Sequence, residues 1–378
     1  MRARGWAALL GIAAMAASSA AAQTAQSTVS LGGVVDLIGR NDQVDVTNRD
    51  SSGASYLDAL RTTLFVDAAL QNNVQLFTQF LIYGYGDVFL YGGYLRFKDV
   101  AGGPVSVNAG LIPTTVGQWG PRAHSDTNPL VGVPLMMNHE TSLTIWAPEP
   151  NVAALLAARD TRPQGGVPMI YESWWNTGVE AYGQVGALDW SVAAITGSPS
   201  LPTRDRNKSA PQGTMRLVWN ATPGLALGAS GFGGQWLWYD LPGMAARDVT
   251  HAMNVGAGAD AAWTVRYLEF HAEALYERWE HPVLPTLAAT SGYLEAKYKF
   301  HPRWYVAGRV ETFRPDQIRD DAGNLVRWDY PVNRAEYGLG FHPTPGVTIK
   351  GVVQSNRFVG GADSLDENHY IVQLSARF

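Results

Sequence analysis

The residue types best suited to binding a metal ion occur in one long stretch of the chain, residues 113–174. His124, Asp126, His139 and Glu140 are all types that ligate metals. Their spacing, however, follows no metal-binding motif. We therefore expect polar, loop-anchoring roles for these four residues and no metal site.

Two histidines outside this stretch have acidic or hydroxyl neighbours and could in principle support catalysis. The two groups are Asp248, Thr250 and His251, and Glu269, His271 and Glu273. Nucleophilic catalysis needs a nucleophile, a base and an orienting group in one place. The sequence contains no Gly-x-Ser-x-Gly element that would supply the nucleophile. We expect neither an enzymatic activity nor a cofactor.

Composition excludes several further classes of protein. The 378 residues include no Cys, which rules out disulfides and thiol chemistry. The 28 basic and 33 acidic residues give a net charge of -5. No strongly basic patch indicates nucleic-acid binding.

The N-terminus has the pattern of a secretory signal peptide. Arg2 and Arg4 precede an apolar stretch from Trp6 to Ala17, and small residues continue to Ala22. A membrane anchor is the alternative, but this stretch is shorter than the roughly 20 residues of a spanning helix. We predict a signal peptide over 1–22 and an exported protein over 23–378.

Apolar and polar residues alternate through most of the exported part. A period of two is typical of strands with one apolar and one polar face. Each alternating segment has about the 9–11 residues, or slightly more, that a tilted membrane strand needs. We predict sixteen strands, at 27–39, 56–70, 74–84, 88–98, 105–112, 175–185, 188–197, 213–220, 225–233, 252–264, 267–279, 290–300, 304–313, 332–341, 347–357 and 368–378.

The connections between these strands alternate between short and long. The short ones contain Asn, Gly and Pro, which make tight hairpins. Short turns at one end and long loops at the other are typical of a transmembrane β-barrel. The predicted fold is all-β, an antiparallel barrel of sixteen strands in which the first strand pairs with the last.

Aromatic residues flank the predicted strands at both ends. Trp219 and Trp263 lie beside short turns, whereas Trp236, Trp279 and Trp328 lie beside long loops. Such aromatic residues often sit at the two membrane interfaces. We predict two aromatic belts, with lipid and lipopolysaccharide around the exterior.

Two sequence stretches resemble known outer-membrane proteins. STVSLGGVVDLIGR is similar to the first strand of Gram-negative trimeric porins. Residues 95–122, LRFKDVAGGPVSVNAGLIPTTVGQWGPR, resemble the phosphate-selective porin O and P superfamily. In that superfamily the loop is preceded by a strand with basic residues, a Gly turn and a strand with the pattern sVxxGxxpxxxG. The resemblance implies an outer-membrane pore and a homotrimer, without fixing the solute.

The C-terminal strand ends abruptly on an aromatic residue. Its alternating apolar positions resemble the signal that outer-membrane barrels present to the barrel assembly machinery. The residues that carry this resemblance are Tyr370, Val372, Leu374 and Phe378.

Charged residues on the polar face of the strands are expected to line the lumen. The predicted wall residues are Arg61, Arg96, Lys98, Arg309, Glu311, Arg334 and Glu336. Basic and acidic residues nearly cancel across the whole inward set, so phosphate selectivity does not carry over from the resemblance.

The third long connection, 113–174, is far longer than an ordinary loop. We expect it to fold into the barrel and narrow the passage, because selectivity depends on the charges at a constriction. The candidate constriction residues are Arg122, Asp126, Glu140, Arg159, Asp160, Arg162 and Glu172.

The predicted function is passive diffusion of small hydrophilic solutes or ions through a water-filled barrel in the outer membrane. The alternative is a plugged or partner-dependent barrel that acts as an adhesin, a receptor or a scaffold. Conductance separates the two, because a plugged barrel does not conduct.

Overall fold

A computed structural model describes the fold for most of the chain. It covers residues 28–41, 57–82, 88–144, 149–161, 166–171, 175–202, 211–237, 241, 246–361 and 366–378. The predicted signal peptide lies outside the described residues.

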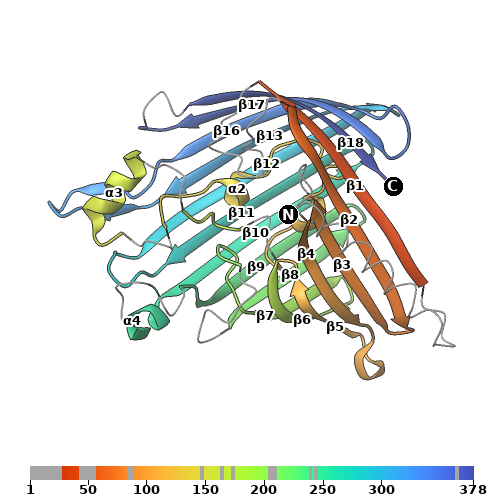
Figure 1. Ribbon diagram of the computed structural model, residues 1–378, viewed down its shortest axis with the longest axis horizontal. Helices are drawn as coiled ribbons and strands as arrows, with labels where there is room; N and C mark the ends of the chain where they lie inside the picture. Colours follow the sequence, from red (N-terminus) through yellow and green to blue (C-terminus); the bar gives the residue numbers. More distant parts are fainter. Residues whose placement is uncertain are drawn as a thin grey trace, which may run out of the picture.

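Sixteen antiparallel strands form a closed barrel, as predicted (Figure 1). Each strand pairs with its sequence neighbour in the barrel, and β1 pairs with β18 to close it. The strands are β1 (Thr28–Arg40), β2 (Leu57–Gln71), β3 (Val74–Ile82), β4 (Val88–Phe97), β5 (Val105–Ile112), β6 (Asn176–Val185), β7 (Leu188–Ile195), β8 (Gln212–Thr222), β9 (Leu225–Gln235), β10 (Met253–Val265), β11 (Leu268–Trp279), β12 (Leu287–His301), β13 (Trp304–Pro315), β16 (Val332–Phe341), β17 (Val347–Phe358) and β18 (Glu367–Arg377).

The connection between β13 and β16 contains a small hairpin that the sequence pattern did not predict. Its strands are β14 (Gln317–Arg319) and β15 (Leu325–Arg327). They form a separate two-stranded sheet outside the barrel ladder. The sixteen-strand count for the barrel is therefore unchanged.

The two faces of the barrel follow the alternation in the sequence. On β11, Phe270 and Tyr276 are exposed on the outside, whereas Glu273 and Glu277 are buried on the inside. Exposed apolar side chains such as Leu294 recur around the exterior. A closed barrel whose outer face is apolar is suited to a lipid bilayer, since every strand edge is paired.

The aromatic belt at the short-turn end is confirmed, but the belt at the long-loop end is wrong for three of its residues. Trp219 and Trp263 are about half exposed, whereas Trp236, Trp279 and Trp328 have no exposed surface. Trp279 occupies the same inward face of β11 as Glu277, so its position along the strand could not place it in lipid. The three buried tryptophans belong to a core inside the barrel.

Three short α-helices in the described residues belong to the long connections. α2 (Leu135–Asn138) lies inside the barrel against β12 and β13. α3 (Val152–Thr161) and α4 (Ala246–His251) lie at the long-loop end, on the left in Figure 1. None of the described helices is long and apolar enough to cross a membrane.

The main hydrophobic core lies within the lumen rather than between sheets. Loop residues Trp119, Leu135 and Met136 pack together with wall residues Tyr293 and Phe313. The apolar loop side chains thus occupy space that would otherwise hold water. The barrel interior is a packed structure over much of its length.

Barrel closure provides a test of the exterior packing. Gly33 exchanges two backbone hydrogen bonds with Phe378, of 3.1 and 3.0 Å. A Cβ at Gly33 would lie 2.8 Å from the Thr63 carbonyl oxygen and 2.6 Å from the Phe378 ring. We expect Gly33→Ala to destabilise the barrel by about 1–3 kcal/mol through overpacking. The measurement is urea unfolding of the refolded protein in detergent.

The matched control is Gly351→Ala, also on the outer face, where a Cβ would meet nothing within 4 Å. Equal unfolding midpoints for the two variants would contradict the close approach at the closure seam.

Candidate functional site

The candidate site is the lumen where the loop between β5 and β6, residues 113–175, crosses the barrel. We call this segment the inserted loop. Its first turns contact β8, β9 and β11. Thr115 shares a hydrogen bond with Thr214, and the Gly117 amide donates to Ser230 Oγ over 3.1 Å. Farther along, the Gln118 amide donates to Glu273 Oε2 over 3.3 Å.

A single arginine on the wall organises the centre of the contact. Arg309 on β13 donates to Glu311 (2.8 Å), Glu295 (3.1 Å) and Glu336 (2.6 Å), all on the inner wall. The terminal nitrogen that donates to Glu336, Nη2, also donates to the Gly132 carbonyl of the inserted loop over 2.6 Å. The guanidinium has no exposed surface. It therefore joins the wall carboxylates to the loop backbone.

The same carboxylates bind backbone amides of the inserted loop. Glu336 Oε1 accepts from the amides of Val131 (3.2 Å) and Gly132 (2.7 Å). Glu311 Oε2 accepts from the Leu135 amide at the start of α2. The wall thus satisfies backbone groups that the inserted loop, lacking a ladder of its own, would leave unpaired.

Two further cations hold the loop backbone through its carbonyls. Arg334 on β16 donates to the Val133 carbonyl over 2.7 Å. Lys350 on β17 donates to the carbonyls of Ser125 (2.5 Å), Asn128 (2.7 Å) and Leu130 (3.0 Å). Together with Arg309, these side chains bind the stretch 125–133 mainly through its main chain.

The charges at the centre of this contact balance. Three cations face three carboxylates, and all six are buried or nearly so: Arg122, Arg309, Arg334, Glu295, Glu311 and Glu336. Arg122 is the loop's own member, and it pairs with Glu295. Buried charges are tolerated when they are paired and hydrogen-bonded, as these are.

The described anchors of the inserted loop lie on ten neighbouring strands of the sixteen-stranded barrel. In the described part of the chain, the hydrogen bonds and ion pairs between the inserted loop and the wall strands end on β8 to β13, β16 to β18 and β1. Ring contacts, such as those of Phe65 with His124 and of Tyr91 with Trp175, reach β2 and β4.

Two cavities lie on the less anchored side. One, of about 560 Å³, is lined by residues of β4 to β8, including Arg96, Glu180 and Arg216. The other, of about 60 Å³, lies between β2 to β4 and the inserted loop. Pro113 lines both cavities.

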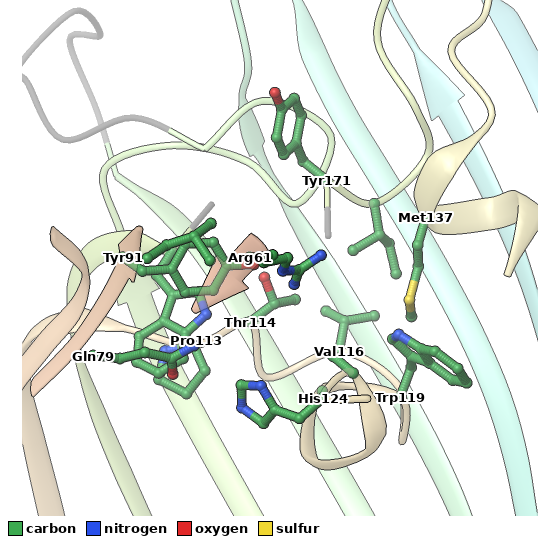
Figure 2. A pocket seen from close by; sticks show the side chains of 15 residues that line it. Arg61, Gln79, Tyr91, Pro113, Thr114, Val116, Trp119, His124, Met137 and Tyr171 are labelled. Carbon is green, nitrogen blue, oxygen red and sulfur yellow. The ribbon is translucent and has the colours of Figure 1, made fainter. Parts of the chain in front are cut away.

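Figure 2 shows the smaller cavity. Arg61 extends from β2 toward the loop residues Thr114 and Val116, with Tyr171 above and His124 below in this view. Gln79 and Tyr91 form the strand side.

The structure places the predicted constriction residues in different parts of the molecule. Arg122 pairs with Glu295, and Asp126 pairs with Arg377 over 2.8 Å. Glu140 is partly buried in the inserted loop. A constriction role for any of them stays a prediction.

The other four predicted constriction residues lie away from the lumen centre or outside the described part. Arg159 and Asp160 pair with each other over 2.7 Å on α3, at the long-loop end. There Arg159 donates to the Arg327 carbonyl. Arg162 and Glu172 lie outside the described residues.

The predicted wall residues separate into two groups. Arg309, Glu311, Arg334 and Glu336 do project inward, but the inserted loop covers them. Arg61 and Arg96 line the two cavities on the less anchored side of the barrel. Lys98 follows β4 at the short-turn end.

Lys350 and Glu295 belong to the site but are absent from the predicted wall and constriction residues. Lys350 lies on the same face as Gln373, its neighbour on the adjacent strand, and Glu295 lies on the same face as Arg309. The alternation of residues along each strand was the available signal. This alternation indicates which face of the strand a residue occupies. It does not indicate which inward-facing residues the inserted loop covers.

The residues considered for a metal site have separate contacts. His124 packs edge-on against Phe65, and Asp126 pairs with Arg377. His139 lies against Phe313 and Phe358, with ring centroids at 4.7 and 6.1 Å. Within the described ranges no cluster of three or more potential ligands could hold a metal ion.

Solved structures share this fold despite very different sequences. Similar chains include OmpT of Vibrio cholerae in its trimer form (TM-score 0.57, 9% identity, 93% of this chain and 99% of that chain) and the outer-membrane channel DcaP of Acinetobacter baumannii (0.57, 12%, 94% and 99%). An anion-selective porin from Comamonas acidovorans is also similar (0.55, 10%, 93% and 99%). No protein-family model and no curated protein sequence matches the chain.

The chain therefore has the porin-like fold of outer-membrane channels, a closed barrel of sixteen strands with a long loop inside. Its apolar exterior, together with this fold, places it in an outer membrane.

The arginine at the centre of the anchor cluster can be tested directly. Arg309→Gln leaves three buried carboxylates without their shared cation, and breaking a buried pair costs about 3–5 kcal/mol. We expect a lower unfolding midpoint and a larger, noisier single-channel conductance as the inserted loop detaches.

Arg278→Gln is the matched control, because its pairing with Glu280 is exposed at the strand end. If Arg309→Gln matched this control in both readouts, the anchoring role of the cluster would be refuted.

Acid should loosen the inserted loop through His139. Burial, with a smaller contribution from Arg334, lowers the pKa of His139 from 6.5 to about 3. Neither ring nitrogen has a hydrogen-bond partner within the described residues. The neutral ring therefore stabilises the fold fully above about pH 6.5, and this stability is lost as the pH falls toward 3.

The protein is exposed to a pH between 6.5 and 4, neutralised rapidly and then treated with trypsin. We expect cleavage within the inserted loop to increase as the pH of the exposure falls. His139→Met should reduce this increase, since it keeps an apolar contact that cannot be protonated. An unchanged pH dependence in His139→Met would assign the effect to another group.

Proposed function

We propose that the protein is a passive outer-membrane diffusion channel for small hydrophilic solutes or ions. The observation that carries the proposal is the pair of cavities that lie beside the inserted loop. The described anchors of the inserted loop lie on β8 to β13, β16 to β18 and β1, whereas the two cavities are lined by residues of β2 to β8. Pro113 lines both cavities, and the proposed route passes through them.

The narrow part of the route limits the size of solute. A cavity of about 60 Å³ between the inserted loop and β2 to β4 holds a few water molecules. Ions and small polar solutes would pass with modest movement of side chains such as Arg61 and Tyr171. Selectivity would then depend on the charges that line this route rather than on the covered cluster around Arg309.

Catalysis and cofactor binding form no part of this proposal. The mature protein would comprise residues 23–378, with 113–174 as the constriction segment. A homotrimer is supported by the likeness to OmpT, whose structure is described as a trimer form. Membership of the phosphate-selective porin O and P superfamily rests on the resemblance of residues 95–122.

The absence of Cys from the sequence permits a direct test of the route. Thr114 lines the smaller cavity, so a cationic thiol reagent on Thr114→Cys should lower the single-channel conductance by about half or more. Gln354→Cys is the control, because Gln354 projects inward on β17 and has no exposed surface behind the inserted loop.

A response at Gln354→Cys with none at Thr114→Cys would place the passage on the opposite side of the inserted loop. Responses at neither position in a conducting barrel would exclude both routes.

A plugged barrel is the second candidate, and the filled lumen favours it. Trp119, Leu135 and Met136 are buried in the core between the inserted loop and the wall. A stably inserted wild-type barrel that carries no current would support this function. If Arg309→Gln then conducted, the inserted loop would be identified as the plug.

A further inference from the structure

We propose that Arg96 forms a binding subsite for organic carboxylate anions in the larger cavity. This proposal rests on the proposed function only for the position of the subsite along the solute route. The cavity of about 560 Å³ is lined by β4 to β8 and by Pro113 at the start of the inserted loop. Arg96 projects into it from the inner face of β4.

Neutral groups hold the Arg96 guanidinium in place. Its Nε donates to Asn108 Oδ1 over 3.2 Å, and one terminal nitrogen donates to the Tyr94 hydroxyl over 3.2 Å. The Phe77 ring centroid lies 4.4 Å from the guanidinium carbon, and those of Tyr94 and Tyr182 lie at 5.8 Å. These contacts fix the plane of the guanidinium group and leave some of its N–H donors available.

The other terminal nitrogen of Arg96 has no hydrogen-bond partner among the described residues, and it is not buried. No described carboxylate lies within 4 Å of the guanidinium. By contrast, Arg216, in the same cavity, is bound to Asp260 through both terminal nitrogens. Arg96 is thus the arginine of this cavity with donors available for an anion.

The rest of the cavity indicates what kind of anion fits. Tyr94, Tyr182, Pro113 and Val218 supply rings and apolar carbons around the guanidinium. A planar fork of donors matches the two oxygens of a carboxylate. An anion with one carboxylate and an apolar body would use both features, whereas a small inorganic anion would use only the first.

Three wall carboxylates oppose tight binding, and two of them, Glu180 and Asp189, line the cavity itself. Asn108 Nδ2 donates to Glu180 Oε2 over 2.8 Å, which links Glu180 to Arg96 through the amide. Asp67, on β2, also interacts electrostatically with Arg96. Their negative charge weakens the hold on an anion, and a subsite in a channel must release what it binds.

Titration calorimetry on the refolded full barrel in detergent tests the subsite without requiring conduction. The probes are benzoate, acetate and inorganic phosphate. We expect benzoate to bind more tightly than acetate or phosphate, and Arg96→Gln to weaken benzoate binding by about tenfold or more. Arg96→Lys should restore only part of the affinity, because it keeps the charge but loses the fork. Arg319→Gln, on the exposed hairpin strand β14, should leave binding unchanged.

Benzoate binding that is absent, or equal in wild type and Arg96→Gln, would overturn the proposal. Phosphate binding as tightly as benzoate would overturn the assigned ligand class. If the barrel conducts, Arg96→Gln should also shift the reversal potential in a salt gradient toward cation preference. A silent wild-type barrel that still binds benzoate through Arg96 would refute the diffusion channel while supporting the subsite.

Discussion

The structure depends on one desolvated set of charges, Arg309 with the three wall carboxylates that it joins. These groups would be costly to bury singly, and they become tolerable only because each is paired and because the inserted loop supplies backbone donors and acceptors. The dependence runs both ways. The wall needs the loop to complete its hydrogen bonds, and the loop has no regular structure in which to satisfy its own backbone between Ser125 and Leu135.

This coupling explains why the interior is apolar as well as charged. Once the charged anchors hold the inserted loop across the lumen, its apolar side chains are enclosed by the wall. Trp236, Trp279 and Trp328 extend that core toward the long-loop end. The barrel thus has an apolar outer face and a packed core inside, and the proposed solute route follows the side with fewer described anchors. Arg61 and Arg96 line cavities on that side.

Much of the fold could be predicted because the alternation of apolar and polar residues along a strand is a local property of the sequence. The sixteen strands, their closure and the inward face of Arg309, Glu311 and Glu336 all follow from a period of two. The candidate site was less predictable. Arg159 and Asp160 belong to the same long connection as Arg122, yet α3 carries them to the long-loop end. Nothing in the spacing of charges along a sixty-residue loop specifies which of them return to the wall.

By itself, the sequence determined a sixteen-stranded membrane barrel with a charged inner face and a long third loop, because alternation, turn composition and loop length act over a few residues at a time. Only the tertiary structure decided that Lys350, Arg334 and Arg309 bind the loop main chain, and that Arg96 keeps donors free. The binding of the loop main chain depends on contacts between residues some 200 positions apart, such as Gly132 with Glu336. The physical reason is that burial, pairing and desolvation are set by neighbours in space, which a local pattern does not record.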